Sequence, residues 1–143
     1  MATAWTYNGS VPGPMIRVTE GDKVRVVLKN ELPEPTTIHW HGVTVPNSMD
    51  GVPGMTQEAV KPGESFTYEF TAQPAGTYWY HPHANSDQQI GIGLYAPLLI
   101  EPKAEAASVA DVDVTMMLGE WARRRRRPMR RCLWPAWSRT TSR

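Results

Sequence analysis

Residues 77–83 read Thr-Tyr-Trp-Tyr-His-Pro-His. The first five of these residues are aromatic or otherwise favoured in β-structure, so the run predicts a strand. That strand leads into two histidines, His81 and His83, separated by one residue. Side chains at positions i and i+2 of a strand leave the same face, about two strand rises apart. The run therefore predicts two imidazoles placed side by side.

A second pair of the same spacing, His39 and His41, lies about forty residues earlier, in residues 36–45, which also predict a strand. Trp40 stands between the two histidines and must point to the opposite face, where we expect it in the core. The two pairs contain every histidine of the chain. Four imidazoles with one spacing predict a transition-metal site, since imidazole suits copper, zinc, iron and nickel. The alternative is that the histidines are ordinary core or surface residues.

The residues around these pairs predict an all-β domain. Thirteen prolines and eleven glycines divide the chain into short segments, and several of these alternate apolar and polar side chains. We expect an antiparallel β-sandwich or Greek-key barrel of about seven strands. Besides the two histidine-bearing strands, the predicted strands are residues 15–19, 22–30, 65–71 and 94–101, and residues 85–93 form a polar connection with one helical turn.

Charge divides the chain into two compositions. Residues 1–122 hold six Lys and Arg against all fourteen Asp and Glu, a net charge of −8. Residues 123–143 hold nine Arg and no acidic residue, a net charge of +9. We therefore predict one domain with both histidine pairs over residues 4–102, then a linker with the first strand of a further domain over 103–121. An Arg-rich tail, disordered or translated out of frame, follows over 122–143.

The tail has two interpretations. An Arg run with interleaved tryptophans is typical of an arm that binds nucleic acid. An out-of-frame translation of a GC-rich gene also accumulates Arg, Pro, Ala and Trp codons. We favour the second interpretation and expect no nucleic-acid partner, because the change of composition after Trp121 is abrupt.

Other sequence features limit the classes of protein. The chain has no run of about eighteen apolar residues, so a membrane span is not expected. The first residues lack the basic and apolar regions of a signal peptide. Cys132 is the single cysteine, so no disulfide within the chain is possible.

A longer string of motifs resembles the N-terminal plastocyanin-like (cupredoxin) domain of multicopper oxidases, the family of the laccases. These motifs run in order from about Trp5 to Glu101, and both histidine pairs stand within them. They are Trp5-Thr6-Tyr7-Asn8-Gly9, Pro12-Gly13-Pro14, Thr37-Ile38-His39-Trp40-His41-Gly42, Met49-Asp50-Gly51-Val52-Pro53, Ala75-Gly76-Thr77-Tyr78-Trp79-Tyr80-His81-Pro82-His83 and Gly93-Leu94-Tyr95-Ala96-Pro97-Leu98. The resemblance implies a cupredoxin-like Greek-key fold.

The resemblance also implies roles for individual residues. In that family the two histidine pairs supply half the ligands of a trinuclear copper cluster. By resemblance, His39 binds the type 2 copper, and His41, His81 and His83 bind the type 3 pair. Asp50 matches a carboxylate outside the ligand shell that serves proton delivery during oxygen reduction. Its alternative role is that of a turn residue before Gly51.

The chain departs from the family pattern in one respect that matters for mechanism. A complete enzyme has two more His-X-His units and a type 1 copper, which needs a thiolate and two imidazoles. Cys132 has no histidine beside it, and no histidine follows His83. We therefore expect half an active site, from a chain truncated or frameshifted after Trp121, so that its status as an enzyme is open.

The parent reaction implied by the resemblance is one-electron oxidation of phenols or metal ions coupled to reduction of dioxygen to water. The partner would be a missing C-terminal cupredoxin domain or further copies of the chain, and the family's usual compartment is extracytoplasmic. Two other functions stay open. One is a stand-alone module that binds or sequesters copper without catalysis. The other is a mononuclear zinc or copper site with hydrolytic chemistry.

Overall fold

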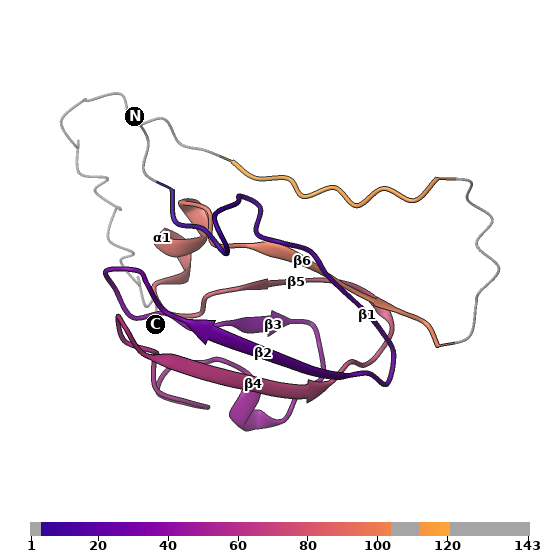
Figure 1. Cartoon of the computed structure of the whole chain (residues 1–143), viewed down its shortest axis with the longest axis horizontal. Coiled ribbons are helices and arrows are strands. Elements are labelled where there is room, and N and C mark those ends of the chain that lie inside the picture. Colours follow the sequence, from indigo (N-terminus) through magenta and orange to yellow (C-terminus); the bar gives the residue numbers. More distant parts are fainter. Residues whose placement is uncertain (1–3, 104–111, 121–143) are drawn as a thin grey trace, which may run out of the picture.

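The computed structural model describes residues 4–103 and 112–120 (Figure 1). Within these ranges the chain forms six strands, one short α-helix and one 3-10 helix. They are β1 (Ile16–Thr19), β2 (Lys23–Lys29), β3 (His39–His41), η1 (Asn47–Met49), β4 (Ser65–Thr71), β5 (Gly76–His81), α1 (Ser86–Gly91) and β6 (Ala96–Glu101).

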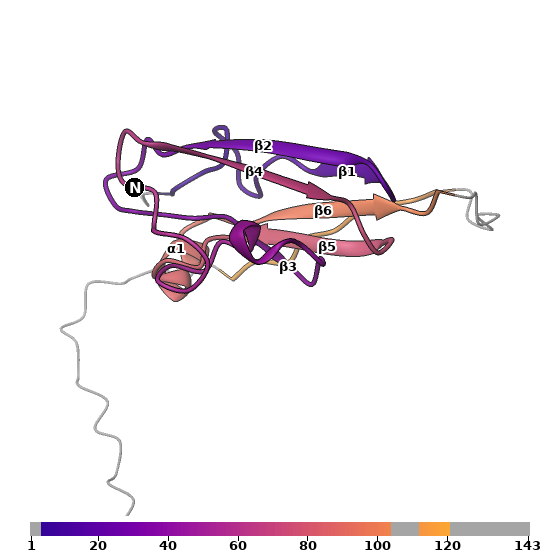
Figure 2. The same ribbon diagram turned by 90° about the horizontal axis from the view of Figure 1, so that it is seen from below.

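The strands form two sheets that pack face to face. One sheet has the order β1-β6-β5-β3, and the other pairs β2 with β4. Figure 2 shows β2 and β4 in one layer and β3, β5 and β6 in the layer beneath it. Between the layers lie fully buried side chains such as Trp40, Tyr68 and Leu98. The predicted all-β sandwich is thus confirmed.

One strand pairing differs from the antiparallel expectation. β1 pairs with β6 in parallel, with Ile16 opposite Leu98. The other three pairings, β2 with β4, β3 with β5, and β5 with β6, are antiparallel. A parallel neighbour needs a long connection, and here almost the whole domain lies between the two strands. Sequence periodicity carries no information about strand direction.

The two-stranded sheet follows the alternation of its sequence. Val24 and Leu28 of β2 are buried, whereas the two lysines at the ends of the strand and the arginine within it are exposed. On β4, Tyr68 and Phe70 are buried on the same inner side. Val27 breaks the alternation and is exposed. Each sheet therefore offers one apolar face to the other, as a sandwich requires.

Strand β3 is shorter than the strand predicted over residues 36–45. It ends at His41 because Gly42 adopts a positive φ of 83°, which strand geometry does not allow. Before it, residues 36–38 direct their hydrogen bonds to a bridge and to side chains. The ladder is thus confined to the three residues that carry the first histidine pair.

The remaining connections also differ slightly from the sequence prediction. The helical turn expected over residues 85–93 is helix α1, and β6 begins two residues later than predicted. Residues 112–120, expected to contain a further strand, have no strand assigned. Four of their five large apolar side chains are exposed, namely Val112, Val114, Met116 and Leu118. Of the region predicted over 103–121 as linker and first strand, residues 104–111 and 121 lie outside the described residues, as does the predicted Arg-rich tail over 122–143.

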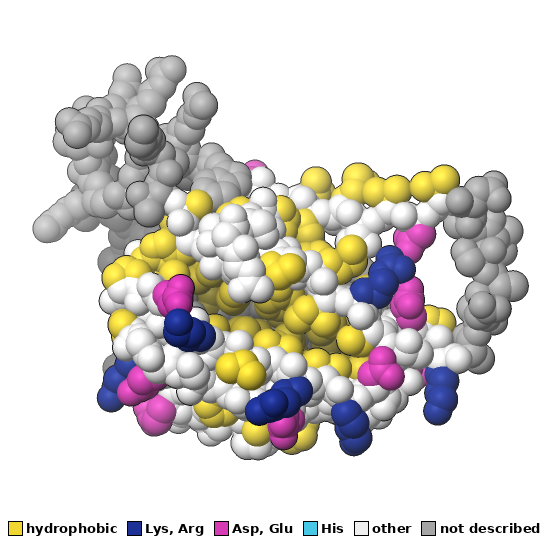
Figure 3. Space-filling model, in the orientation of Figure 1, with side chains coloured by type: hydrophobic (Ala, Val, Ile, Leu, Met, Phe, Trp, Pro, Cys, Tyr) yellow, Lys and Arg dark blue, Asp and Glu magenta, His cyan; other side chains and the backbone are white. Residues whose placement is uncertain are grey.

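On the side of the sandwich between β1 and β2, the layers leave a hollow of about 560 Å³, lined by Ile16, Val26 and Leu28 among others. Figure 3 shows apolar side chains gathered in a hollow on this face. No helix in the described part of the chain is long and apolar enough to cross a membrane.

Candidate metal centre

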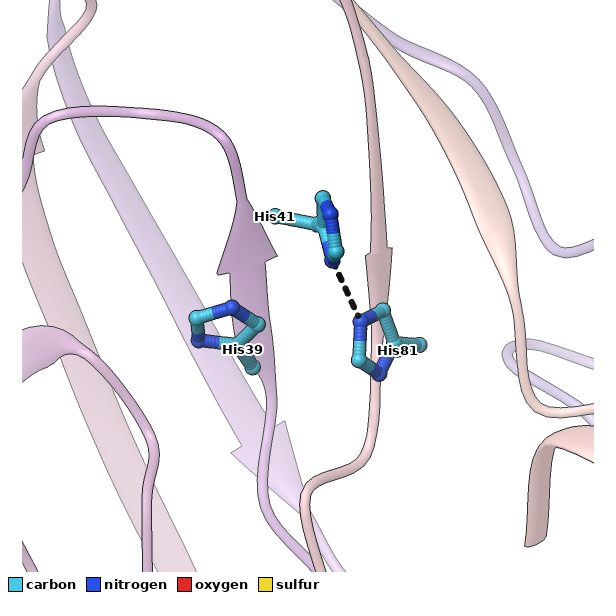
Figure 4. A group of neighbouring side chains, drawn as sticks. All are labelled: His39, His41 and His81. Carbon is cyan, nitrogen blue, oxygen red and sulfur yellow. Dashed lines mark hydrogen bonds between the residues drawn. The ribbon is translucent and has the colours of Figure 1, made fainter. Parts of the chain in front are cut away.

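The pairing of β3 with β5 brings the two histidine pairs together. His39 lies directly opposite His81 in the antiparallel register. Cβ atoms of directly opposite residues lie about 4.5–5.5 Å apart, so their side chains meet on one face. His41 follows His39 on the same face because side chains alternate along a strand. Figure 4 shows these three imidazoles converging between the two strands.

Three histidines form a group that a metal ion could join. One ring nitrogen from each of His39, His41 and His81 lies within 4.8 Å of the others. Nδ1 of His41 faces Nε2 of His81 at 3.2 Å, the dashed line in Figure 4. Two nitrogens bound to one ion at about 2.0–2.1 Å with a tetrahedral angle lie roughly 3.3 Å apart. The observed spacing suits two ligands of one ion.

His81 is held in the form that a metal requires. Its Nδ1 lies 2.9 Å from the carbonyl oxygen of Pro82, and a carbonyl only accepts, so Nδ1 carries the proton. Nε2, which faces His41, therefore keeps its lone pair. Burial, aided by the neighbouring histidines and opposed by the hydrogen bond to Pro82, lowers the pKa of His81 to about 4. The imidazole is neutral at neutral pH, as metal binding demands.

His39 is oriented by the loop that contains Asp50. Its Nδ1 donates to the carbonyl oxygen of Asp50 at 2.8 Å and lies 3.3 Å from the carboxylate Oδ1. Nε2 of His39 is thereby left free to bind. Hydrogen bonding of the second ring nitrogen to a carbonyl or carboxylate is the usual support of a metal-binding histidine. The main chain of Asp50 thus makes the shorter of the two contacts.

His83 lies beside the group but outside it. Its ring centroid is 5.2 Å from that of His39 and 6.4 Å from that of His81. Its nitrogens are not among those that lie within 4.8 Å of one another. The chain leaves β5 at His81, so strand pairing does not place His83 as it places the other three. The structure therefore brings three of the four predicted ligands into one cluster and the fourth next to it.

The two faces of β3 have opposite environments. Trp40 is fully buried and packs on Tyr68, Phe70 and Tyr80, which confirms its predicted place in the core. The rings of His41 and His83 are on the exposed side. The candidate ligands thus open toward the outside of the domain.

Trp79 is a neighbour of the site that the sequence analysis did not single out. Its ring lies 4.1 Å from that of His81 and 5.1 Å from that of His41, centroid to centroid, at tilted angles. Trp79 stands opposite His41 in the register and two residues before His81. The i, i+2 spacing from His81 was the signal that could have predicted it on this face.

The chemical type of the candidate ligands limits which metal ions the site can bind. It consists of neutral imidazoles, and the nearest carboxylate, Asp50, faces the ring nitrogen of His39 that points away from the cluster. Imidazole favours transition ions over magnesium or calcium, which prefer oxygen. The residues present therefore fit a copper or zinc ion.

Comparisons with known proteins agree with this geometry. The family model described as multicopper oxidase matches residues 1–105. Copper resistance protein A of Pseudomonas syringae pv. tomato is 43% identical over 119 residues, which are 83% of this chain and 19% of that protein. Laccase-1 of Emericella nidulans is 39% identical over 131 residues, covering 80% of this chain and 22% of that protein.

Solved structures show the same likeness. A crystal structure of a multi-copper oxidase from Pseudomonas thermotolerans aligns with a TM-score of 0.71 and 50% identity. The alignment covers 72% of this chain and 25% of that one. The chain spans about a fifth of the length of the curated relatives that it matches.

Proposed function

The chain belongs to the multicopper oxidase family, and on that premise we propose that it acts as the N-terminal copper-binding domain of a laccase-like oxidase. The observation that carries the proposal is the convergence of His39, His41 and His81 across the β3–β5 pair. Copper bound there would supply one-electron chemistry, coupling oxidation of phenols or metal ions to reduction of dioxygen to water. The family's usual extracytoplasmic compartment is part of the same proposal.

We further propose a division of the ligands. His39 would bind the type 2 copper, and His41, His81 and His83 would bind the type 3 pair. In support, His41 and His81 face each other through single nitrogens 3.2 Å apart, as co-ligands of one ion would. His39 instead turns its protonated nitrogen to the Asp50 loop and its free nitrogen to the cluster.

The site needs ligands from another source to become a trinuclear cluster. The chain has four histidines in all, and its single cysteine, Cys132, has none beside it. His41 and His83 are exposed, so ligands from outside the domain can reach the copper positions. We propose that a C-terminal cupredoxin domain or further copies of the chain complete the cluster at this face.

Reconstitution with copper tests the assignment. We expect stoichiometric copper binding without intense blue colour, since a blue site needs copper bound to a thiolate. Tryptophan fluorescence should fall as copper binds, because Trp79 lies against two ligand rings, and Trp79→Phe should remove most of that change.

The double variant His41→Ala, His83→Ala should lose tight binding. Met55→Leu, which removes an exposed thioether from the loop after Asp50, should keep it. Tight copper binding by the double variant would refute the ligand assignment. An intense blue band in the wild-type chain would refute the absence of a type 1 site.

For Asp50 we propose that the carboxylate serves proton delivery, while its carbonyl holds His39. Asp50→Asn keeps the carbonyl and removes the charge. We expect unchanged copper affinity and slower oxygen reduction in the assembled oxidase, by about 10²–10⁴-fold, the usual contribution of a positioned proton donor. Oxygen uptake measured at equal copper loading tests this. Unchanged turnover would mean that Asp50 serves only as a turn residue.

A second candidate function is favoured by the three-histidine group itself. Three neutral imidazoles in one chain suffice to hold one ion, so the domain could bind or sequester copper without catalysis. Such a module binds copper and consumes no oxygen with a phenol, even after a domain carrying the complementary ligands is added. Oxygen uptake upon that addition would favour the oxidase.

A further inference from the structure

The position of His83 is not set by the sheet. The β3–β5 ladder pairs His39 with His81, where β5 ends, and His83 lies two residues beyond it. A ligand outside the ladder needs another support if it is to stay in register with the first histidine pair. The structure provides one hydrogen bond for this purpose.

That bond joins His83 to Thr37. The main-chain N–H of His83 donates to Oγ1 of Thr37 at 3.1 Å. Thr37 is fully buried and lies two residues before His39. The two histidine pairs are therefore connected twice, by strand pairing at His39 and His81 and by this side chain across 46 residues.

The segment that carries Thr37 is held from both sides. The main chain of Thr36 exchanges two hydrogen bonds with that of Val60, at 3.0 and 2.9 Å. On the other side, the Ile38 N–H donates to the hydroxyl of Tyr68 at 2.9 Å. With both neighbours bonded to the core, the Thr37 hydroxyl is a fixed acceptor rather than a mobile one.

Helix α1, which follows His83, is attached to the same segment. The buried amide of Gln89 accepts from the hydroxyl of Thr36 at 2.8 Å and donates to the carbonyl of Pro35 at 3.0 Å. Both ends of the loop that contains His83 are thus anchored, one through β5 and one through α1. Thr37 holds the point between them.

We propose that Thr37 is a positioning residue that holds the His83 ligand in register with the first histidine pair. The inference rests on the proposed function, because it concerns copper binding by the same histidines. Groups that hold metal ligands typically contribute 10–100-fold to metal affinity. Replacement of the hydroxyl should also lower stability somewhat, because the hydrogen bond it removes is partly buried.

The test compares three threonine variants of the full chain. Thr37→Val keeps the shape of the side chain and removes the acceptor, Thr37→Ser keeps the hydroxyl, and Thr44→Val is a matched change at an exposed threonine beyond β3. Copper affinity is measured by competition with a chelator, and EPR records the bound Cu(II). Hydrogen exchange of the His83 amide in the metal-free chain gives a readout that needs no copper.

We expect Thr37→Val to bind copper about 10–100-fold more weakly, with a changed EPR spectrum and faster exchange of the His83 amide. Thr37→Ser and Thr44→Val should resemble the wild type. Wild-type affinity and an unchanged spectrum in Thr37→Val would overturn the inference while leaving the proposed function intact. Failure of the wild-type chain itself to bind copper would overturn the proposed function.

Discussion

Gly51 determines how closely the Asp50 loop approaches strand β3. Its φ is +77°, and a Cβ at this position would overlap the carbonyl oxygen of Ile38. The loop can therefore reach His39 only because residue 51 has no side chain. Gly54, in the same loop, has a similar φ of +73° but open space around its Cα.

Alanine substitutions at Gly51 and Gly54 distinguish the effect of backbone strain from the effect of displacing the loop. Both Gly51→Ala and Gly54→Ala should lose about 1–2 kcal/mol of stability from the left-handed backbone. Gly51→Ala should also push the loop away from β3, break the bond between His39 and the Asp50 carbonyl, and weaken copper binding about tenfold or more. Copper titration and urea unfolding of both variants check this. Equal copper affinity in the two would show that the close approach is not needed.

For individual residues, the sequence predicted the candidate ligands better than the groups that surround them. The i, i+2 rule placed His39 and His41 on one face and Trp40 on the other without any structure. The bond from the Asp50 carbonyl to His39 could not be predicted in this way, because it is made by a loop whose path depends on tertiary packing. The same holds for the bond between Thr37 and His83.

Among the elements, β3 depends on its single inward side chain. Trp40 is fully buried between the sheets, in contact with three aromatic rings. Trp40→Ala should cost about 3–5 kcal/mol, which is much of the stability of a small domain. Trp40→Phe should cost less and leave a folded protein, and the exposed change Val27→Ala should stay within about 0.5 kcal/mol. Urea unfolding gives all three values, and a small loss in Trp40→Ala would contradict this role.

Tyr80, on the inward face of β5, should make the stability of the domain depend on pH in the alkaline range. Burial raises the pKa of Tyr80 to about 12, and its hydroxyl donates to the carbonyl of Pro14 at 2.7 Å. Between the ordinary value of 10.0 and about 12, the unfolded chain ionises at this tyrosine and the folded chain does not. Stability should therefore fall as pH rises above 10. Urea unfolding from pH 8 to 11 should show a shallower fall in Tyr80→Phe, and an unchanged slope would contradict this. The remaining fall is due to Tyr7 and Tyr68, whose pKa values burial also raises.

The boundaries of the elements were predicted where periodicity is strong. Residues 65–71 form β4 as predicted, because phenylalanine and tyrosine alternate there with polar residues. The strand predicted over 36–45 is only three residues long in the structure. A turn at Gly42 ends it, and residues 36–38 form hydrogen bonds with other parts of the fold. Neither effect is visible in the alternation of side chains alone.

For the whole molecule, the core and all six described strands lie between residues 16 and 101. We therefore propose that the folding domain ends near Pro102, as the composition also indicates. The described segment 112–120 contacts the body through the ion pair of Arg17 with Asp113 at 3.3 Å, between exposed side chains, and at Gly119, whose backbone lies against the ring of Tyr95. An ion pair of this kind contributes about 0–1 kcal/mol.

A chain of residues 1–103 should therefore fold cooperatively, with a free energy of unfolding within about 1 kcal/mol of the full chain. Asp113→Asn in the full chain is the matched control, since it removes the ion pair alone. Copper affinity should be equal in both forms, because every candidate ligand and its supports lie before residue 103. Urea unfolding followed by far-UV circular dichroism measures the first quantity and copper competition the second. A gradual transition, or weaker copper binding in the short form, would place part of the folding unit beyond Lys103.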